Sequence, residues 1–181
     1  MRERERVAEK PDGIVLADHR DMRGRAWQIW VRRAIFTAIL VVPLLGLANV
    51  FGQRPRTASA EVGAARLEVY APSKLRGGIF FEARFHIGAK QELKDARLVL
   101  QPGWAEGLSI NTLEPSPVGE ASDDGRLVFD LGHIPAGQKY LFFMQFQVNA
   151  TNVAWNRPAD VLLYDGDTLL ARVHHSFTVW P

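Results

Sequence analysis

The sequence has no cysteine among its 181 residues. This absence excludes a disulfide framework, a cysteine nucleophile and zinc sites built from thiolates, and it leaves the redox compartment open. A strong net charge is absent too, because 22 Lys and Arg oppose 20 Asp and Glu for a formal charge of +2. A charge this small gives no reason to expect a nucleic-acid partner. Aromatic residues, at 10% of the chain, exclude a wholly disordered protein.

The chain has a single long apolar run, which carries no charged residue from Ala34 to Gln53. A helix rises 1.5 Å per residue, so the 18 residues that end at Phe51 would span about 27 Å, close to the thickness of a hydrocarbon core. Gly46 and Asn49 add a small notch and a polar side chain, which can contact another membrane helix. We therefore predict a transmembrane helix over residues 34–53. The alternative is the buried core helix of a soluble protein, although no other segment could surround so apolar a helix.

Basic residues predict the orientation of the chain. Residues 1–33 hold nine Lys and Arg and six Asp and Glu, a net charge of +3, and the rest of the chain has a net charge of −1. Because basic segments beside a span stay in the cytoplasm, we predict a cytoplasmic N-terminus and a C-terminal domain outside the plasma membrane. The flanking side chains expected at the membrane interfaces are Trp27, Trp30, Arg32 and Arg33 on the inner side and Phe51 on the outer side.

A cleaved signal peptide is the competing prediction for this N-terminus. Ala58-Ser59-Ala60 has the small-x-small pattern of a cleavage site. The region before the apolar run is 33 residues long, however, and ten residues separate Val50 from Ala60, which is looser than in most signal peptides. Cleavage near Ala60 would release a soluble, secreted domain, whereas an uncleaved chain stays anchored in the lipid bilayer.

The two flanks of the apolar run differ in pattern. Residues 1–33 are predicted to form a polar, basic cytoplasmic tail. Residues 54–65 have mostly small side chains and no period, which is typical of a flexible linker. From Arg66 onward, apolar residues recur at every second position, which indicates strands that bury one face. An extracytoplasmic domain is therefore expected over residues 66–181.

This alternation predicts about eight strands and no helix in the C-terminal domain. Turn residues separate the predicted strands, and Asp165-Gly166 is the clearest hairpin signal among them. Short strands with one polar face indicate an all-β fold, an antiparallel β-sandwich. The apolar sets with this spacing are Phe81, Ala83, Phe85 and Ile87; Ala96, Leu98 and Leu100; Leu127, Phe129 and Leu131; Phe142, Met144, Phe146 and Val148; and Leu169, Ala171 and Val173.

The order of turns and strands also resembles a known family. Pro102-Gly103 follows one predicted strand, and Leu131-Gly132 precedes Pro135-Ala-Gly-Gln138 and then a long alternating strand. Over residues 66–150 this order is similar to the Ig-like domains of bacterial surface proteins. The resemblance implies an Ig-like antiparallel β-sandwich that serves as an adhesive, spacer or interaction module. It implies no catalytic residue and no cofactor.

Few residues have the pattern of a chemical site. The serines have no Gly-x-Ser-x-Gly setting, and no glycine-rich phosphate loop precedes a helix. His174 and His175 are adjacent, so on a strand they point to opposite faces and do not readily share a metal. Asp165 and Asp167 offer oxygen ligands for calcium, but they lack EF-hand spacing and a plain hairpin turn is favoured. Metal binding at either pair stays open, and a hydrolase with a dispersed site is the least favoured alternative.

Two places suggest contact with a partner. The segment from Pro102 to Gly125 is predicted to be the longest irregular stretch of the domain, and its Trp104 and Leu113 resemble the apolar anchors found on binding loops. Trp104→Ala is then expected to weaken partner capture without unfolding the domain. Leu141 and Phe143 lie on the face opposite the core set of their strand, so either both faces of this strand are buried or a partner, the membrane or another segment covers the second face.

The sequence thus predicts a non-enzymatic, single-pass membrane protein with an extracytoplasmic Ig-like interaction module. Its expected partners are the lipid bilayer and another integral membrane or cell-envelope protein, with no nucleic acid and no cofactor. The alternative is a membrane-tethered β-sandwich that binds a ligand or carbohydrate with the help of calcium.

Overall fold

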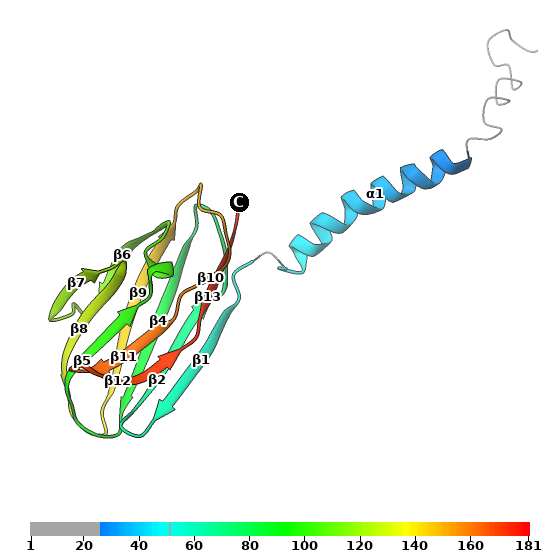
Figure 1. Cartoon of the computed structure of the whole chain (residues 1–181). Coiled ribbons are helices and arrows are strands. Elements are labelled where there is room, and N and C mark those ends of the chain that lie inside the picture. Colours follow the sequence, from blue (N-terminus) through cyan, green and yellow to red (C-terminus); the bar gives the residue numbers. More distant parts are fainter. Residues whose placement is uncertain (1–25, 51) are drawn as a thin grey trace, which may run out of the picture. The chain divides into compact units, whose positions relative to one another are not determined.

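The computed structural model describes residues 26–50 and 52–181 (Figure 1). The chain divides into two compact units after Ala48. The described part of the first unit is a single helix, α1 (Ala26–Leu47), and all thirteen strands belong to the second unit. The prediction of an all-β domain after one N-terminal helix is confirmed.

Helix α1 lies earlier in the chain than the predicted span over residues 34–53. The helix begins at Ala26, ahead of the apolar run, because no helix-breaking glycine or proline lies between Gly24 and that run. It ends at Leu47, where the amide of Ala48 still donates to the carbonyl of Leu44 at 2.9 Å. Asn49 then adopts a left-handed φ of 54°, a conformation that ends many helices. Pro43 lies within the helix.

One five-stranded sheet, called the first sheet below, has the strand order β1-β2-β4-β9-β6. Each neighbouring pair in it is antiparallel. Its strands are β1 (Pro55–Val62), β2 (Ala65–Pro72), β4 (Phe80–Ala89), β9 (Lys139–Val148) and β6 (Leu108–Glu114).

The opposing sheet has the order β12-β11-β5-β8-β7 and is also antiparallel throughout. A short third sheet, β10-β13-β3, contains one parallel pair, between β13 and β3. These strands are β12 (Thr168–Val173), β11 (Val161–Asp165), β5 (Leu93–Leu100), β8 (Arg126–Ile134), β7 (Gly119–Asp123), β10 (Ala154–Pro158), β13 (Ser176–Trp180) and β3 (Lys74–Arg76).

The connections between the two large sheets give an Ig-like sandwich. Strands β4 and β5 are consecutive in sequence but lie in opposite sheets, and β9 returns to lie beside β4. The final hairpin, β11 and β12, lies next to β5 (Figure 1). Sheets linked in this way enclose one apolar layer between them.

The core is built from the inward side chains of both sheets. Along β4 and β9 buried and more exposed residues alternate, as the period of two predicts. Phe129 of β8 meets Phe142 of β9 across the sandwich with ring centroids 5.3 Å apart. Within the first sheet, Phe81 stacks on Phe146 at 5.1 Å. The predicted apolar sets therefore form the core, with the exception of exposed Leu169 and half-buried Leu127.

The prediction of a flexible linker over residues 54–65 is wrong, because most of this segment is strand β1. It pairs with β2 along its whole length, from Pro55 opposite Pro72 to Val62 opposite Ala65. Ala58 and Ala60 are half-buried and pack against the core. β1 lies at the edge of its sheet and exposes most of its residues, so the weak apolar signal of the segment reflects an edge strand rather than a lack of structure. The domain consequently begins before residue 66.

The segment from Pro102 to Gly125 is also more regular than predicted. It contains a short 3-10 turn at Pro102–Trp104 and the strands β6 and β7. Both strands lie at the edges of their sheets and expose most of their residues, so they carry little of the apolar alternation that predicts a strand.

Candidate functional site

Helix α1 carries the membrane-interface residues predicted from the sequence. Trp27–Leu47 has a mean hydropathy of 1.7, none of it is buried, and by length and composition it could cross a membrane or act as a signal sequence. Trp27 and Trp30 are exposed, and the guanidinium of Arg33 lies 5.3 Å from the centre of the Trp30 ring. Arg32 is also exposed on this helix, whereas Phe51 lies outside the described residues.

Trp104 does not have the exposed position predicted for a partner contact. It is fully buried and belongs to the core cluster. Its ring lies against Phe85 at 5.5 Å and Phe177 at 4.8 Å, and its Nε1 donates to the carbonyl of Ala159 at 2.7 Å. The 3-10 turn that carries Trp104 directs the ring inward, where the aromatic residues and one carbonyl satisfy both its apolar body and its polar tip.

Of the other predicted contact residues, Leu141 and Phe143 lie on the outer face of the first sheet. Leu113 of β6 does not, because it lies opposite the buried Met144, is half-buried and packs against the core. Leu141 of β9 is 46% exposed, and Phe143 on the same strand is half-buried. Their register partners on β4 are His86 and Arg84. The second face of this central strand therefore stays partly open within the described chain, and Leu141 is available to a partner.

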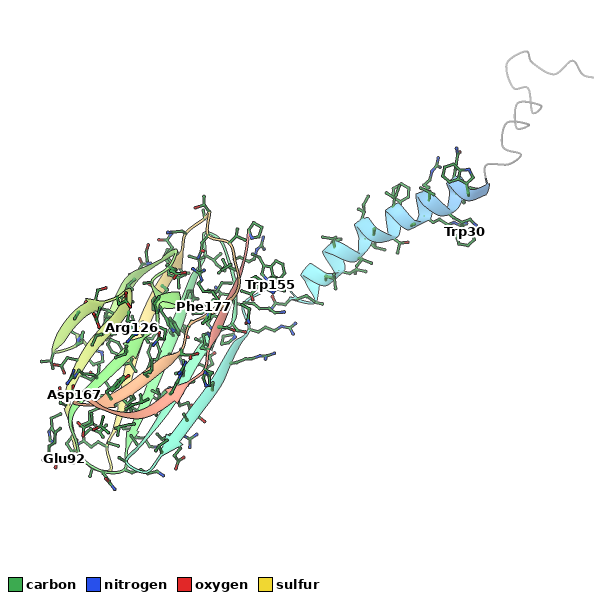
Figure 2. The ribbon with its side chains drawn as sticks, viewed as in Figure 1. Trp30, Glu92, Arg126, Trp155, Asp167 and Phe177 are labelled. Atoms are coloured by element: carbon green, nitrogen blue, oxygen red, sulfur yellow. The ribbon has the colours of Figure 1, made fainter. Side chains whose placement is uncertain are left out.

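Asp165 and Asp167 lie at the hairpin turn between β11 and β12. Asp165 pairs with Thr168 across the turn between β11 and β12, and its Oδ1 accepts the amide of Asp95 at 2.8 Å. Asp167 lies 3.8 Å from the guanidinium of Arg97. No group of three metal-ligating side chains occurs in the part of the chain that the structure describes. Asp167 and Arg126, both labelled in Figure 2, line a shallow groove of about 200 Å³ on this sheet.

Asp160 is the centre of a polar cluster at the β12–β13 corner. It is buried, and its Oδ2 accepts from Arg172 Nε at 2.9 Å and from His174 Nδ1 at 3.1 Å. Its Oδ1 accepts the amide of His175 at 3.2 Å. Burial alone would raise the pKa of this carboxyl, but these donors and the charges of Arg172 and His174 outweigh it and hold the pKa below 3.8.

His175 has a different environment from its neighbour His174. Its ring stacks on Trp104 with centroids 5.5 Å apart, and its Nε2 is buried with no hydrogen-bond partner among the described residues. Burial lowers the pKa of His175 below 6.5, against smaller opposing contributions from the Pro72 backbone and the Asp160 carboxylate. Both histidines lie in the junction between β12 and β13 rather than on a strand, with His174 exposed and the ring of His175 packed against Trp104.

A groove of about 400 Å³ adjoins this corner. Its lining comes from β1, from the β2–β3 junction and from the β12–β13 junction, and consists of Arg56, Thr57, Ala58, Ser73, His174, His175 and Ser176. No local pattern indicates this groove, because its residues come from three separate stretches of the chain, and only the pairing of β1 with β2 places Arg56 near Ala71. The lining combines hydroxyl groups, one guanidinium and two imidazole rings with apolar surface.

An aromatic cluster that sequence analysis missed lies at the end of the sandwich where β1 begins. Trp155, labelled in Figure 2, is 76% exposed, and its ring stands edge-on to Trp180 at 5.5 Å and 89°. Val153 beside it is 66% exposed. The register of β10 with β13 shifts between Ala154 and Arg157, and such a bulge redirects side chains. The signal in the sequence was two tryptophans near the C-terminus in no alternating set.

Among known proteins, no family model matches the chain, and no curated protein matches it. Solved structures to which it is similar include the sporulation control protein Spo0M from Bacillus subtilis, with 15% identity, a TM-score of 0.33, and coverage of 66% of this chain and 51% of that one. An immunoglobulin-like protein from Pseudomonas aeruginosa has 16% identity, a TM-score of 0.33, and coverage of 66% and 94%. The Ig-like assignment accordingly rests on the strand order of the chain itself.

Proposed function

We propose that this protein is a non-enzymatic, single-pass membrane protein that presents an Ig-like interaction module outside the cytoplasmic membrane. The observation that carries the proposal is helix α1, whose segment Trp27–Leu47 has a mean hydropathy of 1.7, carries charge only at Arg32 and Arg33, and is not buried in the protein. Water is a poor solvent for such a surface, and a single helix satisfies its own backbone hydrogen bonds in lipid. The excess of basic residues before the helix supports a cytoplasmic N-terminus.

The interaction surface is the outer face of the first sheet around Leu141. This residue lies on β9, a central strand, and the neighbouring Phe143 extends the apolar surface between Arg84 of β4 and Glu114 of β6. Apolar side chains bordered by charge are typical of a face that contacts another protein. The partner is a second membrane or cell-envelope protein, for which the module acts as an accessory.

Crosslinking in intact membranes tests this surface. Leu141→Asp is expected to abolish crosslinked products of the wild-type chain, because a charge then replaces the apolar centre of the contact. Leu169→Asp is a matched control, since Leu169 is 47% exposed, close to the 46% of Leu141, and lies on β12 of the opposite sheet. Equal loss in both variants, or loss in neither, would remove the face around Leu141 from the proposal.

A further inference from the structure

One surface of the domain is more apolar than folding requires. Phe80, Val153 and Trp155 are each more than half exposed, and Trp180 contacts Trp155. Solvent-exposed tryptophan next to exposed phenylalanine and valine is unfavourable in water and is rarely kept without a contact. Together with the adjoining cations Lys74 and Arg76, these side chains form what we call the aromatic face.

Hydrogen bonds and pairing place the aromatic face at the end of the sandwich that receives the chain from α1. Gln53 Nε2 donates to the carbonyl of Phe80 at 3.0 Å, which fixes the first residues of the domain beside Phe80. Trp180 lies opposite Arg76 in the parallel pair of β13 and β3, and its carbonyl accepts the amide of Gly77 at 2.9 Å. Val153 directly precedes Ala154, which pairs with Val179.

The charge at this end is positive. Lys74 and Arg76 are both exposed on β3, and no carboxylate in the described ranges forms an ion pair with either of them. Aromatic side chains next to unpaired cations are the combination found where proteins meet phospholipid headgroups, since tryptophan rings favour the interfacial layer and Lys and Arg favour anionic headgroups.

The covalent tether limits how far the aromatic face can be from the end of the helix. Five residues, 48–52, separate the last residue of α1 from Gln53. Even a fully extended chain of this length reaches only about 20 Å. The end of the domain that carries Gln53 is therefore the end joined to the helix through this short tether.

We propose that the aromatic face docks on the surface of an anionic phospholipid bilayer, with Trp155 and Trp180 in the interfacial layer and Lys74 and Arg76 at the headgroups. This inference rests on the proposed function, because the tether argument requires α1 to span the membrane. Docking would hold the sandwich in one orientation and leave Leu141 for a protein partner.

The lack of native cysteine allows a direct test with single labels. Val153→Cys and Val62→Cys are labelled with an environment-sensitive fluorophore, and the full chain is reconstituted in vesicles of phosphatidylcholine with phosphatidylglycerol. Val62 is the matched control, because it is 56% exposed and ends β1 at the opposite end from Gln53. Eight residues of extended strand place the two ends of β1 about 23 Å apart.

The label at Val153 is expected to shift to the blue and to be quenched by lipids that carry a quencher near the headgroup, whereas the label at Val62 stays water-like. Trp155→Ser should abolish this shift, and Val118→Ser, a change at another exposed position of the domain, should leave it intact. Added salt should weaken it as well, because screening reduces headgroup attraction.

The outcomes separate this inference from the proposed function. Resistance of the reconstituted chain to alkaline carbonate, together with a water-like Val153 label, overturns the docking inference and leaves the anchored module in place. Removal of the chain by carbonate overturns both. A quenched Val153 label in vesicles of pure phosphatidylcholine that salt does not alter contradicts the role of Lys74 and Arg76.

Discussion

Trp104 is the largest fully buried side chain of the domain, and it links three parts of the core. Its ring touches Phe85 and Phe146 of the first sheet and Phe177 of β13, which Figure 2 labels in the interior of the sandwich. A residue in this position stabilises the fold and does not present a surface to a partner.

Replacement of Trp104 should therefore affect stability before it affects binding. Trp104→Ala is expected to lower the free energy of unfolding by about 4 kcal/mol, because it removes a buried aromatic ring and leaves a cavity. Trp104→Phe keeps most of the apolar ring but loses the hydrogen bond to the Ala159 carbonyl, which should lower the free energy of unfolding by about 1–2 kcal/mol. Thermal and urea unfolding followed by circular dichroism measure both. Wild-type stability in Trp104→Ala would show that the ring does not occupy the core.

His175 should make the stability of the domain depend on pH. Its folded pKa lies below 6.5, so the unfolded chain takes up this proton more readily. The stability that the domain gains from keeping His175 neutral is fully present above pH 6.5. It declines as the pH falls from 6.5 toward the pKa of His175 in the folded protein. His175→Gln should flatten this decline, and His174→Gln, at the outward histidine, should keep it. Urea unfolding over a pH series measures the slope, and identical slopes in the two variants would contradict the burial of His175.

Asp160 adds a second, more acidic step. Its folded pKa lies below 3.8, so the stability contributed by Arg172 and the neighbouring donors is present above pH 3.8 and is lost as the pH falls below it. Asp160→Asn should remove this acid step and lower stability at neutral pH, because Arg172 then loses its carboxylate. The same pH series detects it. If Asp160→Asn lost stability below pH 3.8 as the wild type does, other carboxyl groups would be responsible for that loss.

Among the turns, Gly103 lies against the backbone of another segment, whereas Gly63 has open space around it. A Cβ at Gly103 would lie 2.1 Å from the carbonyl oxygen of Pro158, whereas a Cβ at Gly63 would meet nothing within 4 Å. Gly103→Ala is thus expected to destabilise the domain by about 3 kcal/mol through overpacking, and Gly63→Ala to be near neutral. Thermal unfolding compares the two. Equal melting temperatures would mean that the 3-10 turn moves easily away from β10.

Strand β1 gives a second prediction at this scale. Because residues 55–62 form a ladder with β2, their paired amides should exchange slowly with deuterium. Hydrogen exchange with mass spectrometry measures this protection, and the segment 149–153, between β9 and β10, serves as the control, because the amides of Ala150 and Thr151 donate to no backbone carbonyl among the described residues. Exchange of residues 55–62 as fast as this control would restore the flexible linker. The half-buried Ala58 and Ala60 also mean that cleavage near Ala60 would remove most of a paired strand.

The sequence predicted the strands with clear alternation better than those at the sheet edges. Phe81 to Ile87 and Phe142 to Val148 alternate large apolar and polar side chains, so the core strands β4 and β9 were visible. In β1, by contrast, the inward positions are filled by Ala58 and Ala60, whose small side chains give little hydrophobic signal. The period alone could not identify that edge.

The site residues depended on tertiary packing that no local pattern contains. Trp104 stands among proline and glycine, which is typical of an exposed loop, yet the turn directs it inward to Phe85 and Phe177. Trp155 is an isolated aromatic residue in the sequence, and only the pairing of β10 with β13 places it beside Trp180. Asp160 and Arg172 are likewise joined by the fold, twelve residues apart along the chain.

In the chain as a whole, helix α1 buries none of its apolar surface, whereas the β-sandwich has a hydrophobic core of its own. The core cluster draws its residues from the domain alone, and all of them lie after residue 64. The helix therefore contributes nothing to the described core, and its apolar surface needs an environment outside the protein. Lipid is the solvent in which such a helix is stable.

Cysteine accessibility in living cells tests this claim most directly, because the wild-type chain has no cysteine to react. We predict that Val118→Cys, in the sandwich, reacts with a membrane-impermeant maleimide added to intact spheroplasts, and that Ala8→Cys, in the N-terminal region, reacts only after the membrane is permeabilised. Both chains should remain in the membrane pellet after alkaline carbonate. Protection of Val118→Cys with labelling of Ala8→Cys, or release of the chain by carbonate, would contradict the account.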